Sequence, residues 1–343
     1  MFDRRAHGEH AEVELAIDVT VELRNALAKH GSEAGHYNVL GPDPWRVIWN
    51  HDRSGFISFL EARHCVLTWR SPVASRSDYE HLLASLLNHA RATRRQLFCV
   101  PVNEDVTAVA RDLGMSATWM GTECFVDLAS WNLEGGRREK LRLAQNHGRR
   151  LGLTWREARP LESEIDFTGL ARVEEAWKQE RRERRTDSFL RTSFTELAHL
   201  RRFFVCEESG EVVASTTCTP INSRGWYLQD LVRTPHAPRG ALEGTLILAL
   251  DTLRDEGYTT ASNGPLAFWH PSEGQTDNHP LGPVANRVIA YFDRRYRFQN
   301  INQFRSKVAA DSLRATYLLR SDRMVTPRVV RSLVQLLTRA TTP

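Results

Sequence analysis

The 343-residue sequence contains no run of about 18 apolar residues, the length that a helix needs to cross a bilayer. Its first residues, MFDRRAHGEH, also lack the apolar centre of a signal peptide. Cysteine is scarce, because the five cysteines lie far apart, form no C-x-x-C pair and mostly occur in apolar, strand-like segments. We therefore expect a cytoplasmic protein with reduced, buried thiols and with neither a zinc site nor a disulfide framework.

Several familiar catalytic motifs are also missing. The sequence has no G-x-x-x-x-G-K-[ST], no G-x-S-x-G and no H-E-x-x-H. Among the histidines, His7, His10 and His64 have no partners at ligand spacing, so we interpret them as ordinary polar residues and predict no metal site. Basic residues exceed acidic ones by only 46 − 42 = 4, and so small an excess indicates no partner by itself.

Apolar periodicity predicts an α/β (α+β) protein in which mixed sheets are flanked by helices. With 41% apolar residues, the chain can bury one large core or two ordinary ones, and we predict two domains, residues 12–150 and 151–343. The first domain should contain helices at 12–30, 78–92 and 104–113 and strands at 45–50, 55–62, 64–70, 97–102 and 118–128. The second should contain strands at 153–158, 201–208, 211–220, 226–232, 259–263 and 315–320, with Ser209-Gly210 as a hairpin turn, and helices near 170–177, from 241, at 286–296 and at 326–339.

The stretch from Arg224 to Leu250 reads as a strand, a proline-rich loop and a helix that begins near Ala241. Backbone amides at a helix start can hold an anionic or carbonyl oxygen, which would suit acyl transfer. Strict alternation places Asp230 and Arg233 on opposite strand faces, so they converge only if a bulge or the strand end turns one of them. A strand-end polar group and a solvated charge remain open alternatives, as does a purely helix-stabilising role for Glu243.

A basic helix is predicted at residues 137–150, which contain six Arg or Lys and a single acidic residue, Glu139. Its apolar face should comprise Leu141, Ala144, Gly148 and Leu151, and its cationic face Arg138, Arg142, Gln145 and Arg149. A solvated face usually mixes both signs, so contact with a polyanion is a hypothesis for this helix. Farther on, residues 264–286 favour a mobile loop that covers the substrate. In residues 296–308, aromatic and basic side chains alternate as in base-stacking sites, although a strand with one apolar face has the same pattern.

These segments resemble a family, the C-terminal catalytic region of lysylphosphatidylglycerol synthases, over about residues 35–340. The matching residues are Gly121-Thr122-Glu123, Asp127-Leu128, Gly136, Lys140-Leu141-Arg142, Asn146, Gly152, Asp230-Leu231-Val232-Arg233, Pro238, Gly240, Glu243, Pro265-Leu266, Tyr296, Phe298, Phe304, Lys307 and Tyr317. Three positions depart from the family pattern: Arg239 replaces Asn, Arg305 replaces Lys and Val308 replaces Phe. These departures concern the acceptor more than the class of donor.

The resemblance implies two tandem acetyltransferase-like domains that use aminoacyl-tRNA as co-substrate, without another cofactor. Positions needed for activity in the family correspond to Asp230, Arg233, Glu243 and Lys307. We assign catalytic roles to Asp230 and Glu243. We expect substrate contacts from Arg233, Arg239, Asn263, Lys307 and Tyr296, and tRNA contacts from Arg138, Lys140, Arg142 and Arg149.

An aminoacyl ester is already activated, so positioning and electrostatics can supply most of the acceleration. Lipid-modifying family members usually carry an N-terminal membrane portion that this sequence lacks, and the seryl-tRNA-dependent transferase of the valanimycin pathway is a soluble member. We therefore predict transfer of an amino acid, with serine as a candidate, to an amine, hydroxylamine or hydrazine of a small metabolite in natural-product biosynthesis. Three alternatives stay open: a lipid acceptor, with the 326–339 helix on an anionic membrane; acetyl-CoA-dependent N-acetylation; and RNA binding without catalysis. DNA binding is not expected.

Overall fold

The computed structural model describes residues 13–15, 19–180, 193–270, 274–275, 298–322 and 324–337. Its first half contains β1 (Val13–Leu15), α1 (Thr20–His30), η2 (His36–Leu40), β2 (Arg46–Trp49), β3 (Phe56–Glu61), β4 (Cys65–Trp69), η3 (Arg76–Asp78), α2 (Tyr79–Ala92), β5 (Gln96–Val102), α3 (Glu104–Asp112) and β6 (Ser116–Asp127). Most of these bounds lie within one or two residues of the predicted ones. Local patterning and caps explain this agreement; at α3, for example, the Val106 N–H donates to Asn103 Oδ1 over 3.0 Å.

The second half continues with α4 (Glu139–Arg150), β7 (Thr154–Ala158), α5 (Glu164–Glu180), η4 (Ala198–Leu200), β8 (Arg202–Glu208), β9 (Glu211–Ile221), β10 (Gly225–Arg233), α6 (Ala241–Asp255), β11 (Thr260–Ala267), the short β12 (Trp269–His270) and β13 (Gly274–Gln275), α8 (Phe298–Arg305), η5 (Ser306–Val308), β14 (Ser312–Arg320) and α9 (Pro327–Leu337). Ser209 and Gly210 both have positive φ, 53° and 83°, as a two-residue hairpin turn between β8 and β9 requires. The predicted hairpin is confirmed.

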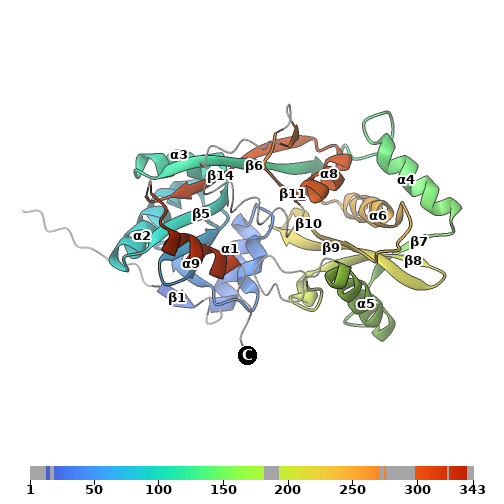
Figure 1. The fold of residues 1–343 in the computed structure, drawn as a ribbon, viewed down its shortest axis with the longest axis horizontal. Coiled ribbons are helices and arrows are strands. Elements are labelled where there is room, and N and C mark those ends of the chain that lie inside the picture. Colours follow the sequence, from blue (N-terminus) through green and yellow to red (C-terminus); the bar gives the residue numbers. More distant parts are fainter. Residues whose placement is uncertain are drawn as a thin grey trace, which may run out of the picture.

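The two halves repeat one topology. In each, antiparallel strands are followed by a helix and a strand parallel to the last of them: β2-β3-β4, α2 and β5 in the first half, and β8-β9-β10, α6 and β11 in the second. This arrangement is the tandem acetyltransferase-like α/β fold that the sequence predicts, with mixed sheets and flanking helices (Figure 1).

One sheet of twelve described strands joins the halves, in the order β1-β2-β3-β4-β5-β14-β6-β11-β10-β9-β8-β7. Strand β6, from the first half, pairs with β11, whereas β14, near the end of the chain, lies between β5 and β6. Strands of the two halves therefore pair directly with each other in the middle of the sheet. The division at residue 150 stays a prediction. Residues 312–320, which lie in the predicted second domain, form β14, and this strand pairs with β5 and β6 of the first half.

Apolar side chains cover both faces of this sheet. In the first half, α1 and α9 pack on one face, and α2 and α3 pack on the other. In the second half, α6 with α4 covers one face, and α5 covers the other. Figure 1 shows α9 beside α1, and its Val329 and Leu336 are buried in the same cluster as Leu23 and Leu27 of α1. The apolar face of α9 is thus used inside the fold.

Two predictions of local structure need correction. The helix expected at 12–30 begins only at Thr20, because Val13–Leu15 forms a strand that pairs with β2, where the Glu14 carboxylate binds Arg53 and the indole of Trp49. Pairing with β2 at the edge of the sheet overrides the helical spacing of this segment. Residues 298–305 form a helix, and not the one-faced strand that the sequence also allowed. The helix expected at 286–296 lies outside the described residues.

Candidate active site

Glu243 and Lys307 meet at the N-terminus of α6. The Lys307 ammonium donates to Glu243 Oε1 over 2.9 Å, and the other carboxylate oxygen accepts the Gly240 N–H over 3.2 Å. The Glu243 side chain is about 10% exposed and that of Lys307 about 32%, so the cation is the partner that solvent reaches. Both oxygens of Glu243 are thereby engaged, one in capping the helix and one in holding Lys307.

A bulge interrupts β10 beside this pair. Leu228 lies opposite Cys218 and Asp230 lies opposite Thr217, so Gln229 is the extra residue of the bulge. The bulge precedes both Asp230 and Arg233, which pair in regular register with Thr217 and Ala214, so it does not bring the two side chains to one face of the strand. Asp230 is half-buried at this point, whereas Arg233 is exposed and donates to the Ala237 carbonyl over 3.3 Å.

The loop between β10 and α6 departs from the expected oxygen-binding role. Its Gly240 has a φ of +100°, and a Cβ there would lie 2.2 Å from the Ala144 carbonyl oxygen of α4. The Gly240 N–H is taken by Glu243, and the Ala241 N–H donates to the Pro238 carbonyl over 3.1 Å. Helix α4 therefore covers the start of α6, and these two amides are not available to a ligand. Arg239 remains exposed on the loop.

Asn263 also has a role other than the predicted substrate contact. Its side chain is fully buried, and its amide donates to the Arg305 carbonyl over 2.7 Å, which fixes the end of α8 on β11. A buried amide in such a place orients the backbone and does not reach solvent. Tyr296, the aromatic residue among the predicted substrate contacts, lies outside the described residues.

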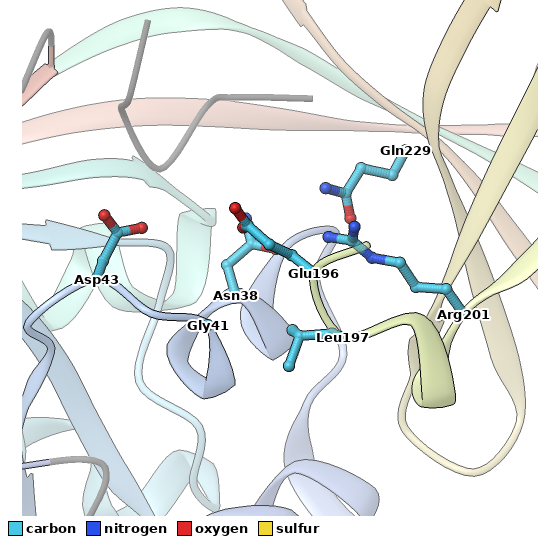
Figure 2. A pocket seen from close by; sticks show the side chains of 7 residues that line it. All are labelled: Asn38, Gly41, Asp43, Glu196, Leu197, Arg201 and Gln229. Atoms are coloured by element: carbon cyan, nitrogen blue, oxygen red, sulfur yellow. The ribbon is translucent and has the colours of Figure 1, made fainter. Parts of the chain in front are cut away.

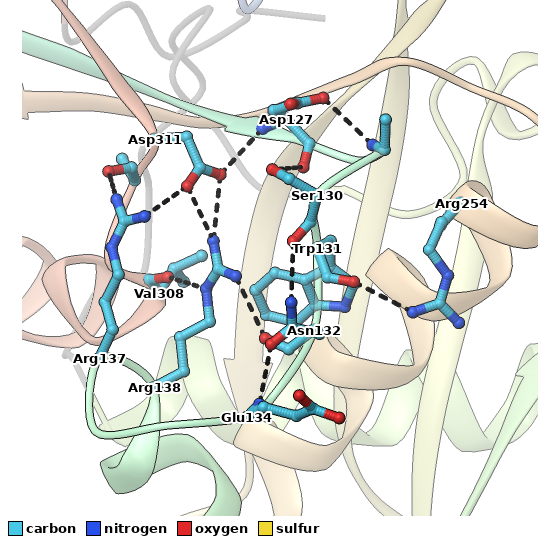
Figure 3. A network of polar contacts seen from close by, with 12 residues as sticks. Asp127, Ser130, Trp131, Asn132, Glu134, Arg137, Arg138, Arg254, Val308 and Asp311 are labelled. Carbon is cyan, nitrogen blue, oxygen red and sulfur yellow. Dashed lines mark hydrogen bonds and ion pairs between the residues drawn. The ribbon is translucent and has the colours of Figure 1, made fainter.

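Arg138 does not belong to a solvent-facing cationic surface. It is 4% exposed, and its guanidinium donates to both carboxylate oxygens of Asp311 and to the carbonyls of Val308 and Asn132 (Figure 3). It also lies over the Trp131 ring, 4.4 Å from the ring centroid. Burial lowers the pKa of Arg138 from its ordinary value, although Asp311 opposes this change. The residue joins α4 to the chain after η5.

Among the other predicted tRNA contacts of α4, one is bound within the fold and two are exposed to solvent. Arg142 donates to the carbonyls of Leu133 and Gly135, and Gln145, predicted on the polar face, is buried instead. Lys140 and Arg149 are exposed. Because Arg138 holds Val308, the exposed start of α4 lies next to the segment that carries Lys307. The error arose because a helical wheel shows spacing but not which neighbours fill each face.

We expect Arg138→Ala and Lys140→Ala to differ in kind. The first removes a buried guanidinium and leaves Asp311 with Arg137 as its remaining cation, so it should lower the free energy of unfolding by about 3 kcal/mol. The second should leave the thermal midpoint within about 1 °C, since isolated surface substitutions change stability little. Thermal unfolding of both variants beside the wild type checks this. Equal effects on the midpoint would contradict the assignment.

A shallow pocket, not predicted from the sequence, lies where the two halves meet. It is lined by Asn38, Gly41, Asp43, Glu196, Leu197, Arg201 and Gln229 (Figure 2). All but two of these residues carry polar or charged side chains. The Gln229 amide oxygen accepts from Thr219 Oγ1 over 2.6 Å, and the Gln229 carbonyl accepts from Arg305 over 3.1 Å, so the bulge connects the pocket with α8. In the sequence, only the turn-forming Asn, Gly, Pro and Asp residues at 38–44 could have indicated the side of the pocket that Asn38, Gly41 and Asp43 form.

Comparison with known proteins decides the family. The family model described as phosphatidylglycerol lysyltransferase, C-terminal, matches residues 24–320 of the 343 residues. The chain belongs to this family. It is 22% identical over 289 residues to the phosphatidylglycerol lysyltransferase of Bacillus subtilis (strain 168), a match that covers 84% of this chain and 32% of that protein. A Staphylococcus epidermidis protein of the same name is 20% identical over 311 residues, 90% of this chain and 36% of the relative. The chain thus spans about a third of the length of these curated relatives.

Two solved structures share the fold. The C-terminal domain of a protein designated a lysylphosphatidylglycerol synthetase, from Agrobacterium fabrum, has a TM-score of 0.79 at 17% identity, over 94% of this chain and 98% of that one. The structure of L-PGS from Bacillus licheniformis has a TM-score of 0.74 at 19% identity, over 93% and 97%. At these identities the likeness concerns the fold alone.

The thiols of this family member are as predicted. All five cysteines are free and buried. Burial raises the pKa of Cys65, Cys124 and Cys206 to about 12 and raises those of the other two as well, so none carries a thiolate nucleophile at neutral pH. Within the described residues no three His, Cys, Asp or Glu side chains form a group that could hold a metal ion. No described helix is both long enough and apolar enough to cross a membrane.

Proposed function

We propose that this chain is an aminoacyltransferase that takes the aminoacyl group from aminoacyl-tRNA and passes it to a small, polar nitrogen nucleophile. The observation that carries the proposal is the pair of Lys307 and Glu243, in a chain whose family is named for aminoacyl transfer. Lys307 is partly exposed beside the basic start of α4, where Lys140 faces solvent. A cation held in place at such a junction suits the phosphates and sugar at the end of a tRNA.

The reaction needs little besides positioning. The acceptor nitrogen attacks the ester carbonyl, a C–N bond forms, the C–O bond to the ribose breaks, and the proton lost by nitrogen reaches the departing oxygen. Lys307 neutralises negative charge near the ester, and Glu243 keeps Lys307 in place instead of acting as a base, because both of its oxygens are engaged. Asp230, at the bulge, is then the carboxylate proposed to take the proton.

The polar acceptor is supported by the pocket beside that bulge. Asp43, Glu196 and Arg201 supply charge of both signs, Asn38 and Gln229 supply amides, and Leu197 is the single large apolar side chain. The apolar face of α9, which would otherwise rest on a membrane, packs against the first half. Both features favour an amine, hydroxylamine or hydrazine of a small molecule.

A lipid acceptor is the second candidate, because the relatives are named phosphatidylglycerol lysyltransferases. In that case the pocket would receive only the polar headgroup. Acetyl-CoA is disfavoured as a donor, since α4 covers the loop at Gly240 where a pyrophosphate would need free amides.

The test is a transfer assay with a pool of charged tRNAs, labelled one amino acid at a time. Purified chain is incubated with each pool and with hydroxylamine, hydrazine and simple primary amines, or with phosphatidylglycerol vesicles. We expect one labelled amino acid to move to a nitrogen acceptor and ribonuclease pretreatment to abolish the product. Label in the lipid extract alone would favour the second candidate. Acetyl-CoA consumption without tRNA, or tRNA retention without deacylation, would overturn the proposal.

A further inference from the structure

Strands β10 and β11 separate close to the bulge. They pair in parallel only from Gly225 opposite Thr260 to Tyr227 opposite Ser262. Beyond that point β10 bulges at Gln229, and β11 has its own register shift between Ser262 and Gly264. The strand carbonyls that face this gap need other donors, because an unpaired buried carbonyl is costly.

Arg305 supplies those donors. Its guanidinium donates to the Gln229 carbonyl on β10 over 3.1 Å and to the Pro265 carbonyl on β11 over 3.3 Å, and it reaches the Tyr227 hydroxyl at 3.5 Å. The residue is only 8% exposed. A planar guanidinium can span two acceptors at fixed separation, which a single ammonium cannot do.

The chain makes room for this side chain at Gly264. This residue has a φ of +80°, and a Cβ there would lie 2.3 Å from Arg305 Nη1 and 2.8 Å from the Tyr227 ring. The Gly264 N–H donates to Ser262 Oγ over 3.0 Å, which holds the shifted part of β11 in place. The site is therefore built around a large group at position 305.

We infer that Arg305 is a positioning residue for the proposed transfer. It holds β10 and β11 apart, so that Gln229 lines the pocket on one side, while Lys307, two residues farther along the chain, reaches Glu243 on the other. Arg305 touches neither reactant and acts through these two side chains. The inference rests on the proposed function for its kinetic part, but not for its structural part.

The experiment compares Arg305→Lys and Gly264→Ala with the wild type. Lysine keeps the charge but can serve only one of the two carbonyls, and alanine at 264 displaces the guanidinium. Both should raise the KM for the acceptor and lower kcat. The combined loss in kcat/KM should be about 10-fold to 100-fold, because small displacements of reacting groups lower the reaction rate strongly. Hydrogen–deuterium exchange should become faster in peptides covering 227–233 and 263–268.

Arg156→Lys is the matched control. This arginine also bridges two partners, Asp166 on α5 and Glu207 on β8, but outside the site. It should lower the thermal midpoint without changing KM or the exchange of the two peptides. A purely structural role for Arg305 would reduce the active fraction and leave KM unchanged, and that result, or unchanged exchange, overturns the inference. If the wild type transfers nothing, the proposed function fails and exchange alone decides the inference.

Discussion

Lys307→Ala should lower kcat/KM for aminoacyl transfer by roughly 100-fold, the effect of removing one preorganised charge or donor from a reaction that depends on electrostatic stabilisation. The ammonium is held 2.9 Å from Glu243 Oε1, and its side chain is about a third exposed, so it can reach a ligand without first leaving a buried pair. Because the largely buried Glu243 loses its counter-charge, the thermal midpoint should also fall, and rates are compared at a temperature at which both proteins are folded. Initial rates over a range of charged-tRNA concentrations provide the measurement.

Lys178→Ala controls for the loss of a lysine and its ion pair. Lys178 binds Glu174 one helical turn away on α5, so its removal changes the same charge outside the site. Its kcat/KM should stay within twofold of the wild type. A Lys307→Ala enzyme of full activity would exclude the proposed role of this cation.

Glu243→Gln separates the two roles that this carboxylate can have. Glutamine can still accept the Gly240 N–H through its amide oxygen, but it no longer pairs with Lys307 as an anion. If Glu243 positions Lys307, the loss should be smaller than for Lys307→Ala, and the pH dependence of kcat/KM should keep its shape. A loss as large as that of Lys307→Ala, with a missing acidic limb, would instead identify Glu243 as the base.

Breaking the ion pair of Arg70 and Glu123 should give the largest change in stability. Arg70, at the end of β4, has a φ of +79°, and its guanidinium donates to Glu123 Oε2 over 2.8 Å. Both side chains are at most 3% exposed. Glu123, on β6, also accepts the Ala34 N–H and the Ser262 hydroxyl, so the pair joins the first half of the sheet to β11.

Arg70→Met should therefore lower the free energy of unfolding by about 3–5 kcal/mol, because it leaves a buried carboxylate without its counter-charge. Glu123→Gln should cost a similar amount through the stranded guanidinium. The double variant has no buried charge, while its glutamine oxygen still accepts from Ser262, and it should be more stable than the sum of the singles predicts. Urea denaturation of the four proteins measures this, and additive losses would contradict the coupling.

A histidine lies next to the Arg70 pair, and its own burial decides its protonation state. His36 is fully buried, and burial together with the adjacent Arg70 charge lowers its pKa to about 3. Its Nε2 lies 3.2 Å from the Ser71 carbonyl oxygen, and its Nδ1 accepts the Glu33 N–H over 3.3 Å. The imidazole is therefore neutral at physiological pH and serves as a structural hydrogen-bonding group.

Much of the local structure follows from the sequence. Strand β9, helix α6 and the Ser209-Gly210 turn could be placed because apolar spacing and turn chemistry depend on near neighbours in the chain. Glu243 could be assigned to the first turn of a helix for the same reason. The motifs around Asp230 and Lys307 indicated the family before any contact was known.

The predicted surface of α4 shows where such reasoning ends. Arg138 has the spacing of a solvent-facing residue, yet Asp311, 173 positions away, and the Trp131 ring bury it. Gln229 gave no signal of its own, because a bulge depends on how β9 and β10 align. Asn263 likewise appeared available until α8 was seen to cover it.

The sequence by itself determined most of the secondary structure, the buried thiols and the family, since each of these depends on residue type and on short-range order. Tertiary structure decided that β6 and β14 cross between the halves, that Glu243 holds Lys307 and that Arg305 fills the gap between β10 and β11. These contacts join residues 40 or more positions apart. Their formation depends on the packing of whole layers, which no local pattern encodes.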